Sequence, residues 1–413
     1  MPQKTGRRRT VGQLKNLPRS AALSHHASAV EKNLSPSRLA ELATSPSSHF
    51  PALSSFGLGA IKDFLSAYAK HSFSAQPPFP KPGPESVVKI GGQTTFALAG
   101  DWATGTDESA MIGNLMSKFN PDYTIHLGDI YYVGEKDYID ENCRNQRQAN
   151  GFDPVQWPRG SIGSFAMNGN HEAYARSGDF FNWLQSDLKQ PATCFFLHNT
   201  HWCILGLDTG YNSEGIPFIS WFGEKYNIPL IKPRCDLPRE AIDWLKQTVI
   251  PLISPDQSVM VLTHHQYLSA FDNEYDNAAE QLAEFPALSG RELLWFWGHE
   301  HRLAGYGLSG DAGIKAHGRC IGHGGMPVEL DPVKRSRPLS FCDRRYYDPD
   351  TQAIVAGPTE YGVNGYVRMT LNGPNLTIDY RDIKDTPMVT EQWQAQAGNA
   401  KLLFQAIDPS LKP

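Results

Sequence analysis

The feature that most constrains the fold is a series of short apolar runs, most of which are followed by side chains that can bind a metal ion. From Val87 onward these runs alternate with segments of helical periodicity, which is typical of an α/β domain. The sequence predicts strands over 94–100, 123–127, 163–168, 202–207, 257–263 and 292–297. It predicts helices over 107–119, with Thr106 as the N-cap, and over 238–249.

Candidate ligands follow five of the predicted strands. They are Asp101; Asp129 and Tyr132 in "GDIYY"; Asn170 and His171 in "NGNHE"; His264 in "VLTHH"; and His299 and His301 in "GHEH". The carboxyl ends of strands in an open α/β sheet line one crevice, so we expect these side chains to converge. Each short motif alone is more often a turn or a polar surface feature. Their combination and order favour a metal centre.

Composition limits the partners and the compartment. The chain is 40% hydrophobic and its formal net charge is -5, so it has no field that would gather nucleic acid or an anionic membrane. We see no apolar stretch of the length of a secretory signal or a membrane span, so we expect a cytoplasmic protein. The six cysteines lack any CxxC spacing, which favours reduced, structural thiols. No pattern indicates the oligomeric state.

The chain divides at a proline-rich segment. Residues 1–85 are predicted to form an N-terminal extension that is partly helical, with the best helical spacing between Ile61 and Tyr68. Its last part, 74–85, reads "SAQPPFPKPGPE", and the prolines predict an extended linker with few contacts across it. We predict a catalytic domain over 86–390 and a C-terminal tail over 391–413.

Two long segments, 209–236 and 327–362, lack regular patterning. Loops of this length in a compact domain are usually functional or disordered. We therefore expect them to wall the crevice.

The motifs occur in a known order. Asp101, "GDIYY", "GNHE", "VLTH" and "GHEH" match the five blocks Asp, GDxxY, GNH(D/E), VxxH and GHxH. Over about residues 90–385 the chain resembles the calcineurin-like metallophosphoesterases and, among them, the purple acid phosphatases. The resemblance implies a four-layer α/β/β/α sandwich with two metal ions between the sheet ends.

The resemblance also implies the ligands of each ion. Most such enzymes carry a histidine two residues after the first Asp, where this chain has Ala103. Purple acid phosphatases use the tyrosine of GDxxY instead, which is Tyr132 here. The implied sets are Asp101, Asp129, Tyr132 and His301 for the first metal, and Asp129, Asn170, His264 and His299 for the second, with Asp129 bridging.

Tyrosine ligation suggests the identity of the first metal. A phenol has a pKa of ~10, so it binds at neutral pH only to a strongly Lewis-acidic ion, and Fe(III) is the natural occupant. The second position suits Fe(II), Zn or Mn. Alternation along the strand exit predicts that Tyr131 points to the opposite side from Tyr132.

The activity implied by the resemblance is hydrolysis of phosphate monoesters, with a metal-bound hydroxide as nucleophile and a small phosphorylated substrate. His171 is then a general acid or a charge-stabilising donor, and the alternative is an orienting hydrogen bond. His265, Arg302 and His323 are candidate substrate contacts, although a surface role is favoured for Arg302. Two other functions stay open: a phosphodiesterase acting on nucleotides or lipid head groups, and a catalytically silent scaffold.

Overall fold

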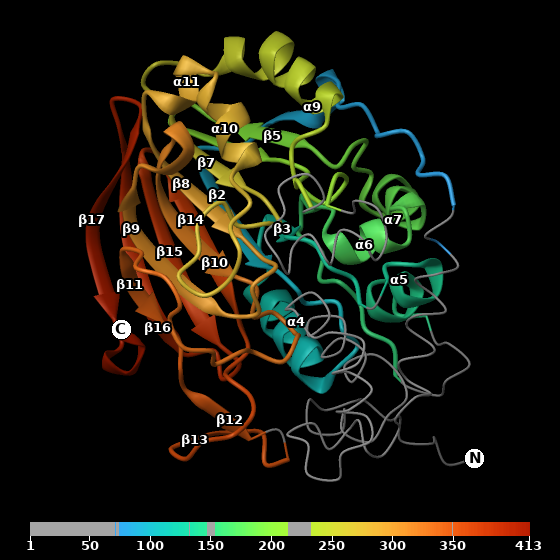
Figure 1. The fold of residues 1–413 in the computed structure, drawn as a ribbon, viewed down its shortest axis with the longest axis vertical. Coiled ribbons are helices and arrows are strands. Elements are labelled where there is room, and N and C mark those ends of the chain that lie inside the picture. The colour runs from blue at the N-terminus through green and yellow to red at the C-terminus, as the bar shows by residue number, and fades with distance from the viewer. Residues whose placement is uncertain (1–70, 72–73, 132, 147–152, 214–232, 349) are drawn as a thin grey trace.

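The computed structural model describes residues 71, 74–131, 133–146, 153–213, 233–348 and 350–413 (Figure 1). Within these residues two large sheets pack face to face, and helices cover both outer faces. This arrangement confirms the predicted α/β/β/α sandwich. The helices expected before residue 70 lie outside the described residues. No described helix has the length and apolar character needed to cross a membrane.

The first sheet mixes parallel and antiparallel pairs, with four successive parallel strands at its centre. In spatial order its eight described strands are β1 (Val87–Lys89), β5 (Phe195–His198), β6 (Trp202–Gly206), β7 (Ser258–Leu262), β8 (Glu292–Trp297), β10 (Lys315–Ile321), β9 (Leu303–Ser309) and β11 (Leu339–Cys342).

The second sheet joins three parallel strands to an antiparallel meander. In spatial order its seven described strands are β17 (Asn399–Ile407), β16 (Pro387–Gln396), β15 (Asn375–Asp382), β14 (Gly365–Asn372), β2 (Gln93–Ala99), β3 (Tyr123–His126) and β4 (Gly163–Ala166). β12 (Tyr346–Asp348) and β13 (Ala353–Val355) form a separate small hairpin.

Short helices fill the connections between strands. They are α4 (Asp107–Phe119), α5 (Lys136–Asn142), α6 (Asn170–Tyr174), α7 (Gly178–Trp183), α9 (Arg239–Trp244), α10 (Asn277–Ala283) and α11 (Pro286–Ser289). A π-helical turn continues α9 through Val249. The α4 helix begins as predicted, because the side chain of Thr106 accepts a hydrogen bond from the Ser109 N–H.

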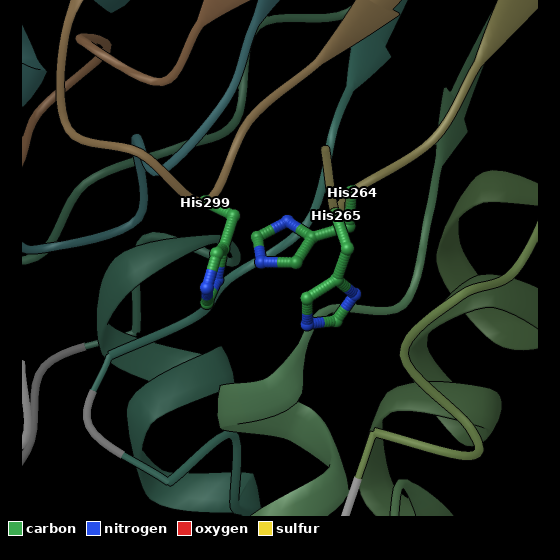
Figure 2. Close-up of side chains that lie close together, drawn as sticks. All are labelled: His264, His265 and His299. Carbon is green, nitrogen blue, oxygen red and sulfur yellow. The ribbon is translucent and has the colours of Figure 1, made fainter. Parts of the chain in front are cut away.

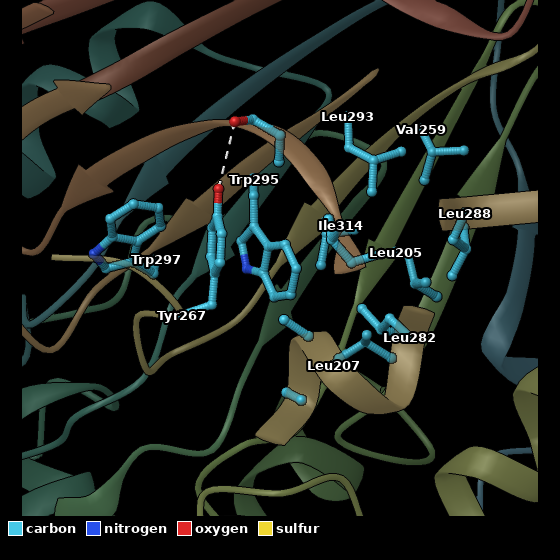
Figure 3. Packing of buried hydrophobic residues seen from close by; sticks show 14 of the residues in the cluster. Leu205, Leu207, Val259, Tyr267, Leu282, Leu288, Leu293, Trp295, Trp297 and Ile314 are labelled. Atoms are coloured by element: carbon cyan, nitrogen blue, oxygen red, sulfur yellow. Dashed lines mark hydrogen bonds between the residues drawn. The ribbon is translucent and has the colours of Figure 1, made fainter. Parts of the chain in front are cut away.

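The period of two along the strands explains why both faces of each sheet are apolar. In β7, Val259 and Val261 belong to the core beneath α9–α11, whereas Met260 and Leu262 belong to the core between the sheets. Figure 3 shows the first of these cores, in which the hydroxyl of Tyr267 donates to the carbonyl of Ala316 at 3.4 Å. Because both faces are buried, these strands read as continuous apolar runs.

The C-terminal residues extend the second sheet. We expected a tail over 391–413, but β16 and β17 pair with each other and β16 pairs with β15. Polar residues alternate with apolar ones there because one face of these strands meets solvent. That alternation is weaker than the apolar runs from which the strands were predicted.

The proline-rich segment packs against the domain that follows it. Phe79 is 5% exposed and its ring lies 5.1 Å from that of Tyr211, whose hydroxyl donates to the Pro77 carbonyl at 2.9 Å. The expectation of few contacts was therefore wrong. Prolines set the extended backbone, but they do not prevent an aromatic side chain between them from being buried.

One of the two expectations about loops also differs from the structure. The segment 327–362 contains β11 and most of the β12–β13 hairpin, so it has more regular structure than predicted. Residues 214–232 of the other segment lie outside the described residues. All six cysteines are buried free thiols.

Candidate metal centre

Ligand-type side chains from both sheets gather at one end of the sandwich. Asp101 and Asp129 follow β2 and β3, and Asn170 opens α6 after β4, so these three come from the second sheet. His264 follows β7, while His299 and His301 follow β8, so the imidazoles come from the first sheet. Figure 2 shows the rings of His264 and His299 turned toward each other, with His265 beside them.

One group of donors surrounds the hydroxyl of Tyr131. Its oxygen lies 2.8 Å from Asp101 Oδ1, 3.1 Å from Asp129 Oδ2 and 3.0 Å from His301 Nε2. A phenol has one proton, so it can donate to only one of these atoms at a time. A cation among them would satisfy the rest.

Tyr131 faces the predicted ligands, contrary to expectation. We expected this side chain to point away from the ligands, but the chain after β3 is no longer an extended strand. Asp129 has φ 72°, and the chain then turns, so the period of two does not apply. Tyr132 lies outside the described residues, and its assignment as a ligand stays a prediction.

A second group of donors surrounds the amide oxygen of Asn170. Its Oδ1 lies 3.0 Å from His264 Nε2 and 2.9 Å from His299 Nδ1. His264 Nε2 is also 3.3 Å from Asp129 Oδ1. Since the Asp129 carboxylate also faces Tyr131, it lies between the two groups.

The donor chemistry of this second group fits a metal ion. His264 Nδ1 is 2.8 Å from the carbonyl oxygen of Leu127, which only accepts, so Nδ1 carries a proton. Nε2 then faces two further acceptors, and either a second ring proton or a cation must lie between them. Burial lowers the pKa of His264, but the charge of Asp129 and its hydrogen bond outweigh this and raise the pKa to about 10.

The carboxylates also need either a proton or a cation between them. Burial, followed by the charge of Asp129, raises the pKa of Asp101 well above its ordinary value. Asp101 and Asp129 are neighbouring buried carboxyl groups, and such a pair favours keeping a proton or binding a cation. Asp101, Asp129 and His264 have ligand atoms within 4.8 Å of one another, as do His264, His265 and His299.

The backbone at the ligands is strained. Asp101, Asp129 and His299 have φ values of 56°, 72° and 62°, in the left-handed region that side chains other than glycine rarely adopt. Such strain costs on the order of 1–3 kcal/mol per residue and clusters at functional sites. A Cβ on Gly298 would lie 2.7 Å from Asp101 Oδ2, so only glycine lets the two loops approach.

Comparison with known proteins identifies the family. The family model of the calcineurin-like phosphoesterases matches residues 94–303, just over half of the chain. The chain belongs to the calcineurin-like phosphoesterase family. A search of curated proteins found no match. Members of this family are hydrolases that bind a dinuclear metal centre.

Solved structures with a similar course of the chain have low identity to this phosphoesterase. The GAP50 anchor of the inner membrane complex of Plasmodium is 13% identical, with a TM-score of 0.49 over 74% of this chain and 89% of that one. PhoD is 15% identical, with a TM-score of 0.46 over 80% and 75%. A dimetal phosphatase from Danio rerio is 12% identical, with a TM-score of 0.40 over 73% and 99%.

In this phosphoesterase His171 packs beside the first group of donors. Its ring centroid lies 4.3 Å from that of Tyr131, and its Nε2 is 3.8 Å from Asp129 Oδ2. Its backbone N–H donates to Asp129 Oδ1 at 3.1 Å. The side chain is 1% exposed.

His265 lies beside the second group, held by a residue that sequence reasoning missed. Its Nδ1 is 3.0 Å from the hydroxyl oxygen of Thr209, which also accepts the backbone N–H of His265 at 3.1 Å. The ring centroid is 4.6 Å from that of His299. Thr209 follows β6, the predicted strand after which no ligand had been identified.

The other two candidate substrate contacts are buried away from solvent. Arg302 is 2% exposed, with its guanidinium 4.1 Å from the ring centroid of Phe271, which contradicts the favoured surface role. His323 packs against Gly365, where a Cβ would come within 2.7 Å of its Nε2. Burial lowers the pKa of His323 to about 4, so its ring is neutral at pH 7.

Glu172 was also missed, although it stands inside "GNHE". Its carboxyl oxygens accept hydrogen bonds from the backbone N–H groups of Asp129, Ile130 and Gly169, at 3.2, 2.6 and 2.7 Å. Burial, then the charge of Asp129, raises its pKa to about 8. The side chain therefore joins the loop that carries Asp129 to the start of α6.

Proposed function

We propose that this protein hydrolyses phosphate monoesters at a dinuclear metal centre of the purple acid phosphatase type. The observation that carries the proposal is that Asp129 faces two separate donor groups, one around Tyr131 and one around Asn170. When bound, two metal ions supply positive charge that stabilises phosphoryl oxygens and lowers the pKa of water.

We assign the residues to two sets. Asp101, Asp129, His301 and a tyrosine hold the first metal, and Asp129, Asn170, His264 and His299 hold the second. The contacts of its hydroxyl support Tyr131 as the tyrosine, whereas the motif supports Tyr132. A phenolate favours Fe(III) at the first position, and the amide and imidazole donors at the second suit Fe(II), Zn or Mn.

We assign proton transfer to His171. During an in-line displacement, water oxygen forms a bond to phosphorus while the ester P–O bond breaks, and the leaving oxygen needs a proton. A protonated His171 can supply this proton and so becomes neutral, and the proton that the attacking water loses restores its charged form. The alternative, an orienting role, is supported by the ring contact with Tyr131. His265 is a candidate donor to a phosphoryl oxygen because it lies beside His299.

Parallel assays test the substrate class. Purified protein is analysed for metal content and then assayed with phenyl phosphate and with bis-phenyl phosphate. We expect two metals per chain and faster release of phenol from the monoester. Preference for the diester would favour a phosphodiesterase, and two bound metals with no hydrolysis of either ester would favour a silent scaffold.

A further inference from the structure

The second ring nitrogen of His301 faces a carboxylate from a loop after β10. His301 Nδ1 lies 3.3 Å from Glu329 Oε1, while Nε2 faces the hydroxyl of Tyr131 at 3.0 Å. The backbone N–H of Glu329 also donates to the carbonyl of His301 at 2.8 Å. Two contacts therefore hold the loop and the ring together.

This contact selects one form of the ring. An ionised carboxylate only accepts hydrogen bonds, so the proton of a neutral His301 belongs on Nδ1. The lone pair of Nε2 is then directed at Asp101 and Tyr131, as a metal ligand requires. A carboxylate on the far nitrogen also makes an imidazole a stronger donor.

Arg302 holds the same carboxylate from its other oxygen. Its Nη2 lies 3.6 Å from Glu329 Oε2 and also 3.6 Å from Asp331 Oδ2. The guanidinium is buried over the ring of Phe271, so its position is restricted. The ion pair therefore holds Oε2 of Glu329 on the side of Arg302 and leaves Oε1 facing His301.

We propose that Glu329 is a positioning residue for the first metal, and that Arg302 orients its carboxylate toward His301. Arg302 therefore acts through Glu329 rather than on substrate. This inference rests on the proposed function, because it takes His301 as a metal ligand. Glu329 belongs to the segment 327–362, which was expected to wall the crevice.

Zinc binding by the full-length chain tests the proposal. Metal-free wild type and Glu329→Gln are titrated with zinc against a competing chelator, and the bound metal is counted by elemental analysis. We expect one of the two sites to bind 10- to 100-fold more weakly in Glu329→Gln, the usual effect of removing such a partner. The other site should keep its affinity.

Asp331→Asn is the matched control. It removes the same charge next to Arg302. However, Asp331 is 43% exposed, and its ion pair is with Arg302 rather than with His301. We expect wild-type zinc affinity. If Asp331→Asn weakens zinc as much as Glu329→Gln does, the charge of the loop matters rather than the contact, and the proposal is overturned.

Two further outcomes are decisive. If Glu329→Gln does not fold, Glu329→Asp is used, because it keeps the charge but withdraws the carboxylate from His301. Glu329→Asp should weaken zinc binding at the same site. If whichever variant folds binds zinc with wild-type affinity, the role of Glu329 is overturned and the proposed function is not. Wild-type protein that binds none of zinc, iron and manganese would overturn the proposed function as well.

Discussion

Single hydroxyl and imidazole groups determine the chemistry proposed for the site. The Tyr131 hydroxyl contacts two carboxylates and an imidazole, and the Asn170 amide oxygen contacts two imidazoles. Both groups include atoms that only accept hydrogen bonds, so each needs either an additional proton or a cation. This is why we assign both groups to metals.

The two candidate tyrosine ligands, Tyr131 and Tyr132, predict opposite effects of substitution on the colour of the iron-loaded protein. A phenolate on Fe(III) gives a charge-transfer band in the visible spectrum. From the contacts of Tyr131 we expect Tyr131→Phe to abolish the band and Tyr132→Phe to retain it, as measured by absorption spectroscopy of the iron-loaded protein. The reverse result would support the motif-based assignment to Tyr132. A colourless, active enzyme would refute ferric iron without affecting the phosphoesterase assignment.

His171 is tested by its effect on turnover. If it protonates the leaving oxygen, His171→Ala should lower kcat by roughly 10²- to 10⁴-fold with both metals still bound. Steady-state kinetics and elemental analysis on the same sample measure both quantities. Loss of a metal in the variant would instead assign His171 a structural role, consistent with its packing on Tyr131.

At the scale of elements, short connections position the ligands. The α6 helix begins at Asn170, and Glu172 in its first turn binds the backbone of the loop after β3. The segment before β1 is attached in a different way, by burial of Phe79 between helices and sheet. An N-terminal truncation near Pro84 therefore removes part of the core.

Phe79 should contribute measurably to stability. Replacing a buried Phe with Ala typically costs about 3–5 kcal/mol, so we expect Phe79→Ala to lower the free energy of unfolding by about 3 kcal/mol in urea titrations. Phe404→Ala is the matched control, because Phe404 is 50% exposed on β17. An equal, small effect of both substitutions would show that the segment before Pro84 is dispensable, as predicted from its composition.

At the scale of the whole molecule, a buried ion pair joins the two sheets. Arg319 on β10 binds Glu391 on β16 through Nη2 at 2.7 Å, and both side chains are at most 1% exposed. Tyr380 and Trp393 also donate to Glu391, at 3.0 and 3.1 Å. Burial raises the pKa of Glu391, but Arg319 and hydrogen bonds from Gln405 and Trp393 together hold it below its ordinary value.

The lowered pKa of Glu391 determines how the stability of the fold depends on pH. A carboxyl group whose pKa is lower in the folded state stabilises the fold above its unfolded pKa of ~4.3, and the contribution is lost as pH falls through the folded value. We expect Glu391→Gln to cost about 3–5 kcal/mol at pH 7, because it leaves Arg319 buried without a charge partner. In urea titrations the difference from wild type should shrink below about pH 4.

Glu292→Gln is the control for this pair. Glu292 on β8 binds Lys401 on β17 at 2.7 Å, so it also joins the sheets, but the two side chains are 27% and 40% exposed. An exposed pair contributes about 0–1 kcal/mol. Equal losses from both substitutions would show that burial does not determine the strength of the Arg319–Glu391 contact.

The sequence by itself determined the layers and the approximate place of the ligands. Buried strands of an α/β sandwich are continuous apolar runs, and β2, β3, β4, β6, β7 and β8 were all predicted within one or two residues. Asp101 and His264 could be named because a ligand at the end of a strand needs only local sequence. The strand β16 and the edge strand β17 were missed because one face of each meets solvent.

Only the tertiary structure decided that Tyr131 faces the site and which loops hold the imidazoles. Tyr131 lies among the ligands because Asp129 adopts a left-handed backbone, which no periodicity predicts. Thr209 and Glu329 contact His265 and His301 across 56 and 28 residues of sequence. Such contacts depend on which strands lie side by side in the first sheet, since they join loops that follow neighbouring strands, and local patterns carry no information about that order.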